Sequence, residues 1–195
     1  MLSITAFSSY VLVTTFTPGP NNIMSMSNAS RYGFRKSIKF NVGIFFGFFI
    51  IIALCSLFSI ELYNLIPSVK SIMPFIGAIY ILWLAWKTLK SKPQSVDATQ
   101  KRTNTFMSGL LLQFVNPKVI LYGITTVSTF IVPYYKSVLV LTGFSVLLAL
   151  IGFVATCCWS LFGSLFQEFL SRNDKVFKIV MALLLVYCGI SLFEQ

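Results

Sequence analysis

Two short segments that interrupt long apolar stretches contain residue types that could bind a polar ligand. The first is TPGPNN at residues 17–22, in which Pro18 and Pro20 bracket a glycine. Proline lacks an amide hydrogen and clashes with the preceding helical turn, so a helix must stop and restart here. The two asparagines that follow offer amide donors and acceptors beside the break. We expect a broken helix whose ends face a polar ligand, and the alternative is a kink that its own asparagines cap.

The second segment is QFVNPKVILY at residues 113–122, and it contains the one charge that lies deep inside an apolar stretch, Lys118. A lysine at the centre of a membrane helix costs about 2.5–3.5 kcal/mol on insertion scales, so a functional role is the default interpretation. Lys118 could attract the carboxylate of a substrate or titrate, and the alternative is that its long side chain reaches the membrane surface. The candidate substrate-binding residues are Thr17, Pro18, Gly19, Pro20, Asn21, Asn22, Gln113, Asn116, Pro117, Lys118 and Tyr122.

The residue types that are missing narrow the class of ligand. No acidic residue lies inside an apolar stretch, and the chain has no histidine. A strongly cationic substrate would lack a buried counter-charge, whereas a zwitterion can place its carboxylate at a helix N-terminus or at Lys118. The four cysteines form no CxxC pair, so neither a metal site nor a disulfide framework is expected. Because no nucleotide-binding motif is present either, we expect no cofactor and no catalytic residue.

The elements that position these residues are predicted to be membrane helices. Apolar residues make up 56% of the 195 residues and charged residues only 10%, against about 25% charged in an ordinary soluble domain. Backbone groups in lipid must be paired internally, so each apolar stretch is expected to be helical. The sequence predicts an all-α polytopic membrane protein with six transmembrane helices, of which the first and fourth are broken. Their approximate ranges are 3–26, 40–60, 71–86, 105–135, 138–166 and 176–193.

The net charge of +10 is distributed as a membrane topology requires. Twelve basic residues fall in the first, third and fifth connecting segments, and only Lys70 and Lys136 fall in the second and fourth. The positive-inside rule therefore predicts that loops 1, 3 and 5 are cytoplasmic and that both termini are periplasmic. Because the basic residues lie between apolar stretches, the expected surroundings are a lipid bilayer, and nucleic acid is not expected as a partner.

The chain is expected to form a single transmembrane transporter domain built from two halves. A polar linker separates three predicted helices from three others, so the halves would enter the membrane in opposite directions, as in an inverted repeat. Pro18 and Pro117 fall in the first helix of their respective halves, and paired broken helices of this kind indicate a transporter binding site. The predicted ranges are 1–195 for the domain, about 1–89 for the first repeat, about 90–104 for the cytoplasmic linker and about 105–195 for the second repeat.

Several motifs are similar to those of a known transporter family. TPGPNN followed by the basic segment RYGFR at 31–35, and FVNPKVILYG at 114–123, resemble motifs of the LysE/RhtB amino-acid exporters. The segment GAIYILWLAWK at 77–87 resembles the cysteine/O-acetylserine exporter branch of that family. The resemblance implies six helices in a bacterial inner membrane and efflux of small neutral amino acids from the cytoplasm by antiport with protons. It also implies that residues 18–22 and 116–118 line the transport path.

Several points stay open on the sequence alone. Threonine, homoserine or leucine export would use the same architecture with a different pocket. A membrane thiol–disulfide electron carrier would need a cysteine at each helix break, and neither break contains one. Proton coupling usually needs a membrane carboxylate, so Lys118 or the substrate itself would have to carry the proton. Gly43 and Gly47 form a GxxxG pattern that could pack helices within the chain or join two copies in a homodimer.

Overall fold

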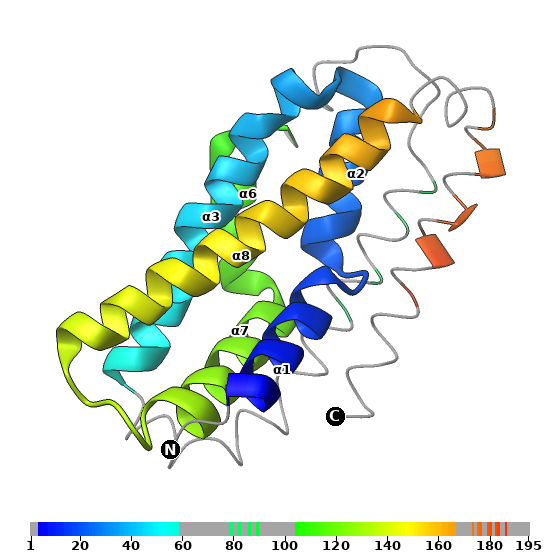
Figure 1. Cartoon of the computed structure of the whole chain (residues 1–195). Coiled ribbons are helices and arrows are strands. Elements are labelled where there is room, and N and C mark those ends of the chain that lie inside the picture. Colours follow the sequence, from blue (N-terminus) through cyan, green and yellow to red (C-terminus); the bar gives the residue numbers. More distant parts are fainter. Residues whose placement is uncertain are drawn as a thin grey trace.

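Helices make up all the regular structure in the described part of the chain (Figure 1). The computed structural model describes residues 4–58 and 104–166, together with scattered positions between 79 and 89 and between 173 and 186. Most of the third and sixth predicted spans and of the linker lies outside these residues, so the six-span inverted repeat stays a prediction. The elements are α1 (Ile4–Phe16), α2 (Pro20–Tyr32), α3 (Phe34–Leu57), α6 (Phe106–Val115), α7 (Pro117–Thr125), the π-helix η1 (Thr126–Ile131) and α8 (Val138–Leu165).

Two of the described helices are long and apolar enough to cross a membrane, namely α3 with 24 residues and α8 with 28 residues. A third candidate span begins with α6 and continues from Pro117 to Ile131, and it is bent by 65° at the break between these two parts. The prediction of an all-α protein with several apolar spans is therefore confirmed for the described residues.

The longest helix, α8, lies across α2 and α3 and packs against both of them (Figure 1). The largest apolar core lies where α1, α3, η1 and α8 meet. Its most enclosed side chains, each at most 1% exposed, are Val11, Ile52, Val127, Ile131, Leu148 and Ala149. Because α7 also adds side chains to this core, the core packs α1, which ends at the first break, together with α7, which begins after the second break.

Glycines set the close approach of α3 to α6. A Cβ atom placed on Gly43 would overlap the carbonyl oxygen of Phe106, and one placed on Gly109 would overlap the carbonyl oxygen of Phe40. Gly47 faces the next turn of α6 in the same way. Small residues let two helix backbones approach closely, so the GxxxG pattern of α3 is used to pack helices within the chain. The homodimer stays a prediction.

The connection between α2 and α3 is shorter than the apolar pattern predicted. The first apolar stretch ends near Met26 and the second begins near Phe40, yet the two helices extend toward each other until only Gly33 separates them. Arginine and lysine favour helix nearly as well as alanine, so the basic residues of this region continue the helices. Gly33 adopts a φ of 79°, a conformation that glycine reaches without strain. The limits of the apolar stretches mark the expected depth of the membrane rather than the ends of the helices.

Candidate functional site

The first predicted break is confirmed between α1 and α2. Helix α1 ends at Phe16 and α2 begins at Pro20, which occupies the first helical position, where no amide hydrogen is needed. Gly19 precedes it in an extended conformation with φ −170°, and no side chain in the described part of the chain caps this end of α2. The first backbone bond of the restarted helix runs from the amide of Ile23 to the carbonyl of Gly19, at 2.9 Å.

The second predicted break is confirmed between α6 and α7, and here a side chain does cap the restarted helix. Asn116 separates the two helices, and its side-chain oxygen accepts a hydrogen bond from the amide of Lys118 at 3.2 Å. Pro117 again occupies the first helical position. Asparagine is among the preferred residues at such a cap, which explains why the helix restarts at this residue.

A cluster of side-chain amides joins the two breaks. The Asn21 amide donates to Gln113 Oε1 at 2.8 Å, and the Gln113 amide donates back to Asn21 Oδ1 at 3.1 Å. The same Asn21 oxygen accepts a hydrogen bond from Asn116 at 2.9 Å. Gln113 also donates to the carbonyl of Gly109, one turn earlier in α6, at 2.9 Å. Residues that lie more than 90 positions apart thus form one network beside both helix ends.

Lys118 holds the C-terminal end of α1. Its ammonium donates to Thr17 Oγ1 at 2.9 Å, to the Thr17 carbonyl at 3.1 Å and to the Pro18 carbonyl at 3.3 Å. The proline-containing break deprives these carbonyls of helical partners, and the C-terminal pole of a helix favours a positive charge. On the other side of the break, the Asn22 amide donates to the carbonyls of Thr15 and Thr17, both at 2.9 Å. The half-buried lysine is therefore stabilised by the opposite half of the chain.

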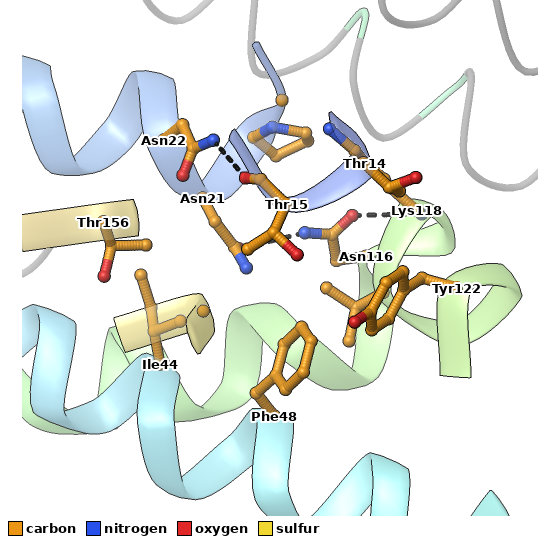
Figure 2. Close-up of a pocket in the computed structure, with 14 residues that line it drawn as sticks. Thr14, Thr15, Asn21, Asn22, Ile44, Phe48, Asn116, Lys118, Tyr122 and Thr156 are labelled. Atoms are coloured by element: carbon orange, nitrogen blue, oxygen red, sulfur yellow. Dashed lines mark hydrogen bonds between the residues drawn. The ribbon is translucent and has the colours of Figure 1, made fainter. Parts of the chain in front are cut away.

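A pocket of about 430 Å³, part of it open to the outside, lies between the two breaks (Figure 2). Seven of the eleven predicted residues line it, and the other four, Thr17, Pro18, Gln113 and Pro117, are at the breaks behind it. The lining is Thr14, Thr15, Gly19, Pro20, Asn21, Asn22, Ile44, Phe48, Asn116, Lys118, Val119, Tyr122, Gly152 and Thr156.

Comparison with known proteins decides the family. The chain matches the family described as LysE type translocator over residues 12–195. It belongs to this family. The chain is 42% identical over 190 residues to proteins named cysteine/O-acetylserine efflux protein from Escherichia coli strain K12, Shigella sonnei and Shigella flexneri, an alignment that covers 97% of this chain and 97% of each relative. No solved structure matches the chain.

Membership of this family confirms the resemblance seen in the motifs. The protein is a multi-pass membrane transporter of the inner membrane, and the prediction that it is not an enzyme is also confirmed. The pocket therefore lies in a LysE-type translocator, between two broken helices of a kind that forms transport sites.

Tyr122 gives the pocket of this LysE-type translocator a polar group that has no hydrogen-bond partner in the described part of the chain. Its ring stacks on Tyr10, with centroids 6.0 Å apart and an angle of 4° between the planes, and it packs against Phe48 at 5.6 Å. The buried hydroxyl makes no hydrogen bond within the described residues, although the side chains of Thr15 and Thr126 lie near it. A buried hydroxyl normally finds a partner, so this group is available to a ligand.

Sequence reasoning missed seven residues that line the pocket of the translocator. Thr14 and Thr15 directly precede the first break, and this adjacency could have identified them. The other positions are Ile44, Phe48, Val119, Gly152 and Thr156. Their residue types are common in any membrane helix. Val119 follows Lys118 on α7, and the packing of α3 and α8 across the breaks brings the other four to the site.

Proposed function

We propose that this translocator exports small neutral amino acids of the cysteine and O-acetylserine kind from the cytoplasm, driven by the proton-motive force. The observation that carries the proposal is the meeting of a lysine ammonium and an uncapped helix N-terminus at one pocket. Both groups favour a carboxylate, and the described residues that line the pocket include no acidic side chain that would favour a cation.

The carboxylate of the substrate would bind where Gly19 faces Lys118. A Cβ atom on Gly19 would lie 3.0 Å from Lys118 Cδ and 3.1 Å from its Nζ, so only glycine leaves the ammonium this close to the start of α2. The N-terminal amides of α2 carry the positive pole of that helix, and no described side chain makes a capping hydrogen bond to them. An anionic oxygen placed here would be stabilised both by the Lys118 ammonium and by the positive pole of α2.

The remainder of the pocket suits the other parts of a small amino acid. Oxygen atoms of Thr14, Thr15 and Tyr122 can accept hydrogen bonds from the substrate ammonium. Ile44 and Phe48 form an apolar wall, which leaves no partner for a charged substrate side chain. The proposed substrates are therefore zwitterions with short, uncharged side chains.

Relatives that match over nearly their whole length support the same substrates. Proteins named for efflux of cysteine and O-acetylserine share 42% of aligned residues with this chain. Export of threonine, homoserine or leucine is the alternative within transport. We further propose that loops 1, 3 and 5 are cytoplasmic and that the two halves form an inverted repeat. Lys118 or the substrate amine would carry the proton.

The proposal is tested with purified protein in liposomes loaded with radiolabelled O-acetylserine or cysteine. Imposing a proton gradient is expected to accelerate release of these two compounds above that from protein-free liposomes. Threonine, homoserine and leucine are measured in parallel. Faster release of one of them would assign the protein to the alternative substrate class, and no gradient-dependent release of any amino acid would contradict the proposed function.

A further inference from the structure

A second group of buried polar residues lies one helical turn from the pocket, on three different helices. Along α2, Ser25 follows the pocket residue Asn22 by one turn. Along α8, Ser160 follows the pocket residue Thr156 by one turn. Along α3, Asn41 precedes the pocket residue Ile44 in the same way. One turn of helix is about 5.4 Å, so Ser25, Asn41 and Ser160 extend the pocket in a single direction. All three are 0% exposed.

Hydrogen bonds connect these residues across the three helices. The Asn41 amide donates to Ser160 Oγ at 2.9 Å, and Ser160 Oγ donates to the backbone carbonyl of Ser25 at 3.2 Å. The Asn41 amide also lies 3.7 Å from the sulfur of Cys157. We refer to Ser25, Asn41 and Ser160 as the Asn41 cluster.

The Asn41 cluster is incomplete in this conformation. The side-chain oxygen of Asn41 and the hydroxyl of Ser25 are buried and have no hydrogen-bond partner among the described residues. Polar residues that only join membrane helices satisfy one another across the interface. Two unpartnered groups at the same junction instead indicate that another species, a polar ligand or water, occupies this position for part of the time.

The direction from the pocket to the Asn41 cluster leads to the basic end of the protein. Beyond the cluster, α2 ends beside Arg31 and α3 begins beside Arg35 and Lys36. This direction is closed, because a Cβ atom on Gly163 of α8 would overlap the backbone carbonyl of Met26 on α2. The two helix backbones therefore touch at the next turn and leave no room for an amino acid.

We propose that the Asn41 cluster is the closed passage between the pocket and the basic end of the protein. A zwitterionic amino acid passes through it when α8 moves away from α2, and its ammonium then meets the free oxygen of Asn41. The inference rests on the proposed function for the identity of the ligand. The existence of a water-accessible passage at this position can be tested separately.

Cys157 provides a natural probe of this passage. In one variant Cys157 is the only cysteine, with Cys55, Cys158 and Cys188 replaced by alanine. In a second variant all four native cysteines are replaced by alanine and Arg35→Cys supplies a single new one. Arg35 is exposed, so this cysteine marks the basic end. A membrane-impermeant maleimide is applied to vesicles of each orientation. Cys157 is expected to react from the same side as position 35, and saturating O-acetylserine is expected to change its rate by about threefold or more.

The two parts of this experiment fail in different ways. Reaction of Cys157 only from the opposite side, or no reaction in vesicles that transport, would overturn the passage whatever the substrate is. Reaction from the side of position 35 that no tested amino acid alters, in vesicles that release none, would support the passage and reject the proposed function.

A substitution at Asn41 tests whether the Asn41 cluster is a passage for substrate or only a contact that joins the helices. Asn41→Leu keeps the volume of the side chain and removes its polar groups, so thermal stability should be kept while export falls about tenfold. The matched control is Ser145→Ala on α8, since Ser145 is equally buried but its hydroxyl donates to Leu141 within its own helix. The proposal would be overturned if Asn41→Leu exported as well as the control. It would also be overturned if the loss of export in Asn41→Leu came with a clearly lowered melting temperature.

Discussion

Lys118 is the residue on which the two halves of the site depend most. Replacing it with alanine leaves the carbonyls of Thr17 and Pro18 without their charged donor and removes the positive charge from the pocket. Hydrogen bonds to charged groups contribute about 1.5–3 kcal/mol, so we expect Lys118→Ala to reduce O-acetylserine export at least about tenfold. Release from cells with matched amounts of protein in the membrane measures this effect.

The control for this prediction is another lysine of the same chain. Lys136 is exposed between η1 and α8, away from the pocket, and Lys136→Ala should export as the unchanged protein does. Equal export by the two variants would show that Lys118 does not bind substrate and only joins the helices.

A different prediction concerns Tyr122, because its hydroxyl has no hydrogen-bond partner within the described residues. An unpaired buried group costs about 1–3 kcal/mol, so Tyr122→Phe should leave the melting temperature unchanged or raise it. If the hydroxyl binds substrate, the same variant should raise the KM for O-acetylserine about tenfold. Tyr134→Phe, at an exposed position, is the control. A lower melting temperature with an unchanged KM would assign the hydroxyl to the protein's own packing.

At the scale of the elements, the contact between α3 and α6 depends on glycine. Gly109→Ala would place a methyl group against the backbone of Phe40, and overpacking of this kind costs about 1–3 kcal/mol. We expect a lower melting temperature in detergent and a lower yield of folded protein. Gly143→Ala on α8 meets no described residue within 4 Å and should gain up to about 1 kcal/mol from helix propensity. Equal melting temperatures for the two variants would show that α3 and α6 can move apart to admit the methyl group without loss of stability.

The elements also show why part of the site could be predicted from sequence and part could not. Both helix breaks follow from proline chemistry, which is local and needs no knowledge of neighbouring helices. Asn21, Asn116 and Lys118 could be selected because polar residues in membrane helices are rare. The lining residues Phe48 and Gly152 could not be selected in this way, since they are ordinary membrane residues that reach the site only through packing.

The resolved arrangement as a whole has one closed end. Helices α2 and α8 touch at Met26 and Gly163, while the pocket between the two breaks remains partly open. A transporter must open each side in turn, so this conformation fits one step of a cycle in which α8 separates from α2. Because glycines hold α3 tightly against α6, we expect these two helices to stay together while α8 separates from α2.

The orientation of the whole molecule is the remaining prediction, and charge decides it. Arg35 lies at the basic end of α3, and Lys136 lies near the opposite end, in the connection between η1 and α8. The positive-inside rule places the first on the cytoplasmic side and the second on the periplasmic side. In a cysteine-free background, a membrane-impermeant thiol reagent added to whole cells should therefore label Lys136→Cys and spare Arg35→Cys. The reverse result would make the basic end periplasmic, and the passage through the Asn41 cluster would then serve as an exit for exported amino acids rather than an entrance.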